Sequence, residues 1–133
     1  MYLLDTSALS EPLRRRPHPR FSEELMRAPS DGLHTSSVCV MEMRYGSARK
    51  GDASLWDRIQ HDVLAHVQVL PFGEAEAVVA GDLLARLQET GQSIGIEDIQ
   101  IAATALVSDL AVVTANESHF IRIPGLRIVN WMV

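Results

Sequence analysis

The feature that most limits the fold of this chain is a regular alternation of short apolar segments with longer segments of helical pattern. The short segments predict buried strands at residues 2–4, 33–36, 67–70, 110–114 and 126–129. Parallel strands need a crossover between them, usually a helix, and helices then cover both faces of the sheet. The sequence therefore predicts an α/β fold around a mainly parallel sheet, in a single domain over residues 1–133.

The helical segments are expected at residues 6–13, 21–27, 38–49, 53–65, 74–89 and 97–108. Helices favour Ser, Thr, Asp or Asn at their start, because the side-chain oxygen accepts a hydrogen bond from a free amide of the first turn. We therefore expect Thr6 or Ser7 to cap the first helix, and Ser36 or Ser37 to cap the helix at 38–49.

Composition excludes several classes of protein. Apolar residues make up 47% of the chain and charged residues 22%, which suits a folded core rather than disorder. No apolar run approaches the roughly 20 residues of a membrane span, and the N-terminus lacks the pattern of a signal peptide. The single Cys39 cannot form an internal disulfide. A cytoplasmic protein with no membrane association is expected.

The net charge of −5 is unusual for a protein that binds nucleic acid. Bound divalent cations would offset part of that charge where a phosphate must approach. Positive charge is also concentrated in one stretch that holds Arg14, Arg15, Arg16 and Arg20. This stretch has two open interpretations: it contacts phosphates or an acidic partner, or it is a solvated loop.

Asp5 directly follows the first predicted strand. In parallel α/β sheets, ligands bind outside the carboxyl ends of the strands, so Asp5 is expected at the crevice where such ligands lie. The alternative is that Asp5 only caps the first helix. Because Thr6 and Ser7 are also available as caps, we favour a functional Asp5.

Asp98 lies on the apolar face of the helix predicted at 97–108. The residues that share this face are Ile101, Ala102 and Ala105. The opposite face carries Glu97, Gln100, Thr104 and Ser108, so Glu97 is the expected solvated acid. An inward-facing charge is costly, and Asp98 should therefore have a cation or a hydrogen-bonding partner. The alternative is an acid placed near the helix start by the macrodipole.

Glu42 is a third acid of interest, within the helix predicted at 38–49, although an ion pair with Arg44 or Arg49 would also explain it. A cluster of carboxylates suits Mg²⁺ or Mn²⁺. The five His residues show no paired ligand spacing that would indicate zinc. The chain has neither a Gly-rich phosphate loop nor a G-x-S-x-G elbow, so P-loop and serine-esterase chemistry have no support.

Four segments, spread over nearly the whole chain, form a recognisable series. They are LLDTSAL at 3–9, TSSVCVME at 35–42, GIED at 95–98 followed by IAATA at 101–105, and VTAN at 113–116 with Phe120 behind it. Each segment alone is a weak signal. In this order they resemble the PIN-domain ribonucleases, specifically the VapC-type toxins of bacterial type II toxin–antitoxin pairs.

The resemblance implies a three-layer α/β/α fold and a Mg²⁺ or Mn²⁺ ion held by Asp5, Glu42 and Asp98. It implies an endoribonuclease that hydrolyses RNA phosphodiester bonds with a metal-activated water, assisted by Asn116. It also implies a small VapB-like antitoxin as partner, whose tail blocks the site, and a homodimer.

This chain departs from the family pattern at two positions. Asn116 stands where the family often has a fourth acid, and His119 stands where an acid often precedes the Phe. Asn116 can bind an ion through its carbonyl oxygen but supplies no charge, so one metal is expected rather than two. Thr114 matches the family's hydroxyl at that strand end and is expected to orient Asp5 or a water, with Thr6 in a similar supporting role.

Two other classes of protein remain as alternatives. A PIN-like module that binds RNA or protein with weak or lost catalysis is favoured only by Asn116, and three intact acids argue against it. A receiver-type phosphotransfer domain would need an acidic pair near the first strand and a later Lys. The only lysine is Lys50, in a predicted helix tail, so this class is disfavoured.

Overall fold

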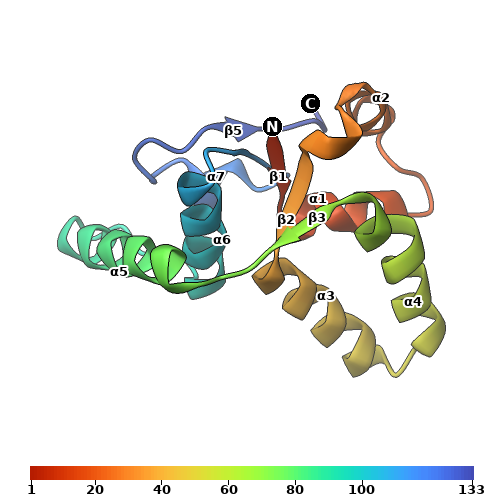
Figure 1. Cartoon of the computed structure of the whole chain (residues 1–133), viewed down its shortest axis with the longest axis horizontal. Coiled ribbons are helices and arrows are strands. Elements are labelled where there is room, and N and C mark those ends of the chain that lie inside the picture. Colours follow the sequence, from red (N-terminus) through yellow and green to blue (C-terminus); the bar gives the residue numbers. More distant parts are fainter.

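The computed structural model describes residues 1–133 and contains a five-stranded sheet with helices on both faces (Figure 1). The strands are β1 (Tyr2–Leu4), β2 (Leu33–Ser36), β3 (Gln68–Leu70), β4 (Ala111–Val113) and β5 (Ile128–Val129). Their spatial order is β3-β2-β1-β4-β5, and every neighbouring pair is parallel. The predicted α/β fold with a mainly parallel sheet is confirmed.

Seven α-helices cover the sheet. They are α1 (Thr6–Ser10), α2 (Pro19–Arg27), α3 (Ser37–Lys50), α4 (Ala53–Arg58), α5 (Glu74–Glu89), α6 (Ile96–Val107) and α7 (Glu117–Phe120). Strands β2 and β3 follow β1 toward one edge of the sheet, and β4 and β5 lie on the other side of β1. Because parallel crossovers are right-handed, the connections in these two directions place their helices on opposite faces. Figure 1 shows α1, α2 and α4 on one side of the sheet and α5, α6 and α7 on the other. None of the helices combines the length and the hydropathy that a bilayer crossing requires.

The central strands and α6 form the middle of the core. Leu3 and Val112, on neighbouring strands, are fully buried, as continuous apolar strands covered on both faces should be. Helix α6 packs between the sheet and α5, and is buried on most sides. Thr104 was predicted to face solvent, and that prediction is wrong: its side chain is fully buried, with its hydroxyl donating to the Gln100 carbonyl.

Several helices and strands have other boundaries than predicted, at places where the backbone departs from regular helix or strand geometry. The helix predicted at 6–13 divides into α1 and a 3-10 turn at Glu11–Leu13, where Pro12 has no amide to donate. The helix predicted at 53–65 continues beyond α4 as a π-helical turn at Ile59–Val63 and a 3-10 turn at Leu64–His66. The last strand begins later than predicted, after a turn in which Gly125 has φ of 76°. Helix α7 was not predicted, because four residues are too few to show a helical period.

The helix caps differ from prediction at α1 and agree at α3. Asp5, rather than Thr6 or Ser7, caps α1: its Oδ1 accepts a hydrogen bond from the Ala8 amide at 2.9 Å. Strand β1 ends at Leu4 and helix α1 begins at Thr6, so Asp5 is the only residue at the cap position. Ser36 caps α3 by accepting from the Val38 amide at 3.1 Å, as predicted.

Candidate active site

A polar hollow lies at the carboxyl ends of the central strands, where the direction of strand order reverses between β1 and β4. Open α/β sheets place their ligands at this switch point. The hollow has a volume of about 380 Å³ and only one apolar lining residue. Its lining residues are Asp5, Thr6, Ser7, Ser10, Glu42, Glu97, Asp98, Ile101, Asn116 and His119. The four residues predicted for catalysis (Asp5, Glu42, Asp98 and Asn116) therefore share one hollow, called here the carboxylate hollow.

Asp5 enters this hollow from the junction of β1 and α1, and is only 4% exposed. Its Oδ1 accepts hydrogen bonds from the Ser7 hydroxyl at 2.6 Å and from the Ala8 amide at 2.9 Å. Burial raises the pKa of Asp5, and the charge of Asp98 adds to the rise, whereas these hydrogen bonds and one from Thr114 oppose it. Oδ2 is the less engaged oxygen, so Asp5 can cap its helix and still offer an oxygen to a cation.

Glu42 projects from α3 and is held by a residue of α1. Its Oε1 accepts a hydrogen bond from the Thr6 hydroxyl at 2.6 Å. Burial raises the pKa of Glu42, and the charges of Asp98, Glu97 and Asp5 raise it further, against the Thr6 hydrogen bond. The structure assigns Arg44 a different contact, over the ring of Trp56 at 5.1 Å, so Glu42 is oriented by a hydroxyl rather than by that arginine.

Asp98, in the first turn of α6, has the hydrogen-bonding partner that its inward position requires. Its Oδ2 lies 2.9 Å from Nδ1 of His119 on α7. Burial raises the pKa of Asp98, His119 opposes that rise, and Glu97 adds to it. The sequence alone did not identify His119 as this partner. The available signal was that a histidine occupies the position before Phe120 where the resembling family often has an acid.

Glu97 also lines the hollow, although its place on the helix predicts a solvated side chain. It is half-buried rather than fully solvated, because the start of α6 reaches over the hollow. The backbone amide of Asn116 donates to the Thr114 hydroxyl at 2.9 Å, and that fully buried hydroxyl lies 3.5 Å from the Ser7 hydroxyl. Glu117, the residue after Asn116, does not line the hollow and accepts a hydrogen bond from the Asn130 side chain at 3.3 Å.

The chemistry of this donor set fits a hard divalent cation. The four acids of the hollow are Asp5, Glu42, Glu97 and Asp98, and mutual repulsion contributes to the raised pKa values of three of them. Carboxylate and amide oxygens are ligands that Mg²⁺ and Mn²⁺ prefer. No three His, Cys, Asp or Glu side chains lie close enough to bind one ion together. An ion in this hollow would therefore keep part of its water shell, as Mg²⁺ commonly does.

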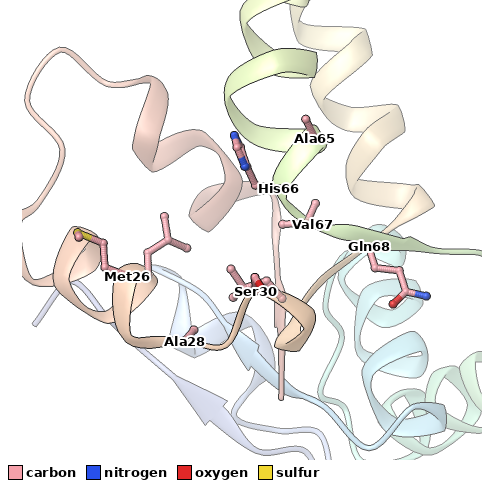
Figure 2. A pocket seen from close by; sticks show the side chains of 9 residues that line it. Met26, Ala28, Ser30, Ala65, His66, Val67 and Gln68 are labelled. Atoms are coloured by element: carbon pink, nitrogen blue, oxygen red, sulfur yellow. The ribbon is translucent and has the colours of Figure 1, made fainter.

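A larger pocket at the opposite, amino end of β2 and β3 has a different character (Figure 2). Its volume is about 630 Å³, and six of its nine lining residues are apolar. Met26 and Ala28 contribute from the end of α2, and His66 and Val67 from the segment before β3. No acid lines this pocket, so it lacks the oxygen ligands of a Mg²⁺ site.

Comparison with known proteins agrees with this geometry. Residues 2–126 match the family described as PIN domain. Ribonuclease VapC2 of Haemophilus influenzae is 30% identical over 131 residues, covering 98% of each chain. Toxin FitB of Neisseria gonorrhoeae is 32% identical over 126 residues, covering 90% of this chain and 91% of that protein. The crystal structure of VapBC2 from Rickettsia felis, bound to a DNA fragment from its promoter, superposes with a TM-score of 0.89 at 26% identity and covers 98% of each chain.

The chain belongs to the PIN-domain family, since the match spans nearly all of its length. Within that family, its relatives place it among the VapC-type ribonuclease toxins. The predicted resemblance and the predicted three-layer α/β/α fold are both confirmed.

Proposed function

We propose that this protein is a Mg²⁺- or Mn²⁺-dependent endoribonuclease that hydrolyses phosphodiester bonds of RNA. The observation that carries the proposal is the convergence of Asp5, Glu42 and Asp98 from β1, α3 and α6 on one hollow, each with a raised pKa. Carboxyls with perturbed pKa values that share a cleft are typical of functional sites, and a divalent cation would relieve their repulsion.

The side chains of the hollow have separate roles in this proposal. Asp5, Glu42 and Asp98 would hold the cation, in part through waters of its shell because the three carboxylates do not converge on one point. When bound, the cation would neutralise charge on a phosphodiester and activate a water. Ser7 fixes Asp5, Thr6 fixes Glu42, and His119 fixes Asp98, each by a hydrogen bond. Such partners hold ligand side chains in a productive orientation. Asn116 would contribute its carbonyl oxygen, and because it brings no charge we propose one cation rather than two.

The partners are proposed from the relatives. The Rickettsia felis structure contains VapBC2, and its toxin chain has the fold of this chain throughout. We propose that this chain likewise pairs with a small VapB-like antitoxin that covers the carboxylate hollow, and that it forms a homodimer in the cytoplasm. A short reading frame directly upstream whose product co-purifies with this chain would support the pairing, and size-exclusion chromatography with light scattering would test the dimer.

A catalytically weak binding module is the second candidate, because Asn116 replaces an acid that proteins of the PIN-domain family often have. The first experiment separates the two functions. Purified protein is expected to cleave RNA in Mg²⁺ or Mn²⁺ and to stop when EDTA is added, with activity restored by excess metal. RNA binding without cleavage in either metal would favour the binding module and contradict the proposed reaction.

Stability should depend jointly on Mg²⁺ and pH. Burial raises the pKa of Asp5, Glu42 and Asp98, so the folded protein holds more protons than the unfolded chain between the ordinary carboxyl pKa and the raised values. Stability from these groups therefore falls as pH rises through that window, and a bound cation restores it. We expect Mg²⁺ to raise Tm more at about pH 8 than at about pH 5, where protons compete with the ion. An equal Mg²⁺ effect at both values, measured by differential scanning fluorimetry, would contradict this expectation.

Thr6→Val should weaken catalysis without unfolding the protein. The substitution keeps the side-chain shape but removes the hydroxyl that donates to Glu42 at 2.6 Å. Loss of a partner that orients a metal ligand costs about 10- to 100-fold in activity or metal affinity. Thr6→Ser keeps the hydroxyl and is expected to retain most activity. Initial rates and Mg²⁺ titrations of both variants test this, and a fully active Thr6→Val protein would show that Glu42 needs no such support.

A further inference from the structure

Two further hollows adjoin the carboxylate hollow and share lining residues with it, and the three together are called here the groove. On one side, a hollow of about 320 Å³ shares Asp98 and His119 with it and also contains Arg122, and is called here the Arg122 hollow. On the other side, a hollow of about 330 Å³ shares Thr6, Ser10 and Glu42 and also contains Arg14 and Lys50. This one is called the Lys50 hollow. The groove is therefore acidic in the middle and carries cations at both ends.

Arg122 is well suited to bind an anion from outside the protein. The ion pairs of the structure involve Arg14, Arg27, Arg127 and His119, and none involves Arg122. Besides Arg122, the shared Asp98 and His119, and the apolar Ile94, the lining consists of Ser93, Gly95 and Ser118, which leave room and offer hydrogen-bond donors. An arginine guanidinium binds phosphate oxygens in a two-pronged geometry, and the adjacent hydroxyls can complete the contact.

The cations of the Lys50 hollow are also available. Lys50 is exposed at the end of α3 and forms no ion pair in the structure. Its charge acts on exposed Asp52, whose carboxylate already accepts hydrogen bonds from Ser54 and Leu55. Arg14 is 69% exposed and contacts Glu11 only at 3.5 Å. Glu11 itself is buried and also accepts a hydrogen bond from the His18 amide at 2.8 Å, so Arg14 can turn its exposed guanidinium toward another anion while Glu11 keeps a partner.

We propose that a single RNA strand runs along this groove, with the phosphate to be cleaved at the carboxylate hollow and neighbouring phosphates held by Arg122 at one end and by Lys50 and Arg14 at the other. The proposal rests on the proposed ribonuclease function. The net charge of −5 and the central acids repel RNA, so binding needs cations on the path of the strand. An RNA strand carries one phosphate per nucleotide, so while one phosphate lies at the centre of the groove its neighbours reach the cations at the two ends. The three basic residues are thus positioning residues that set which bond reaches the acids.

Binding to a catalytically inactive protein tests the path separately from the reaction. The Asp5→Asn protein is combined in turn with Arg122→Gln, Lys50→Gln and Arg86→Gln, the last being an exposed arginine of α5 outside the groove. The probe is a fluorescein-labelled single-stranded RNA of 12 nucleotides and mixed sequence, with Kd measured by anisotropy over a range of KCl. We expect Arg122→Gln and Lys50→Gln each to weaken binding several-fold and to reduce the slope of log Kd against log salt by about 0.7. Arg86→Gln should change neither value.

The outcomes distinguish this inference from the function on which it rests. Equal Kd values and salt slopes for all three double variants would overturn the groove path, while RNA cleavage by the wild-type protein would leave the proposed function standing. An effect of Arg122 without one of Lys50, or the reverse, would overturn a path across both ends. Stronger competition by a poly-glutamate peptide than by unlabelled RNA would assign the cations to an acidic protein segment instead. In the active protein, Arg122→Gln should raise KM for RNA far more than it lowers kcat.

Discussion

Asp5→Asn is expected to abolish RNA cleavage while leaving the protein folded. The reason is that the two functions of Asp5 use different properties of its side chain. Capping of α1 needs only an acceptor, because the Ala8 amide and the Ser7 hydroxyl both donate to Oδ1. Asn keeps that oxygen and is as good a cap as Asp. Cation binding needs the negative charge and the second oxygen, which Asn replaces with an amide that repels a cation.

The stability of this variant in EDTA provides the internal control. Because burial raises the pKa of Asp5, the carboxylate is costly in the metal-free protein, and its removal should leave Tm equal or higher. Asp5→Ala, by contrast, loses the cap as well and should cost about 1 kcal/mol of stability. RNA cleavage and thermal unfolding of both variants are the measurements. An Asp5→Asn protein that still cleaves RNA would show that Asp5 serves only as a helix cap.

The sequence predicted those parts of the site that depend on local pattern. Asp5 was placed at the crevice because it follows an apolar strand, and Asp98 was assigned to the inward face because apolar residues recur at helical spacing after it. The alternation of strands and helices likewise predicted a mainly parallel sheet covered on both faces, although it did not predict the order of the strands. These are consequences of short-range geometry, which a single sequence records.

The contacts that orient the acids join residues far apart in the sequence, so no local pattern predicts these contacts. Thr6 and Glu42 are 36 residues apart, and their hydrogen bond exists only because α1 and α3 pack together. The pairing of Asp98 with His119 likewise depends on how α7 folds back against α6. Glu97 was predicted on the solvated face from the helical period, yet it lines the hollow because the first turn of α6 stands at its rim. Helical period assigns a face, but it does not say what lies beyond the end of the helix.

Asp98→Asn and Glu97→Gln are expected to differ sharply in their RNA cleavage rates, although the two acids are neighbours in the first turn of α6. Both interact with the helix dipole to a similar extent, so loss of either charge should have a similar, small effect on helix stability. Their positions relative to the other acids differ. The charge of Asp98 acts on both Asp5 and Glu42, whereas Glu97 acts on Glu42 and Asp98 and is not among the main causes of the pKa rise of Asp5. Asp98 is therefore the acid of α6 that can share a cation with Asp5.

We expect Asp98→Asn to lower the cleavage rate by more than about 100-fold, which is the most that loss of an orienting partner costs. Glu97→Gln should lower the rate by less than about tenfold. Asn at position 98 still accepts a hydrogen bond from His119, so the loss would report the missing charge rather than a displaced α7. Single-turnover rates on one RNA at saturating Mg²⁺, with Tm as the folding control, measure both effects. If Glu97→Gln were the inactive protein and Asp98→Asn the active one, the cation would have to bind at the rim of the hollow. Asp5, which lies at its base, would then be too far from the ion to act as a ligand.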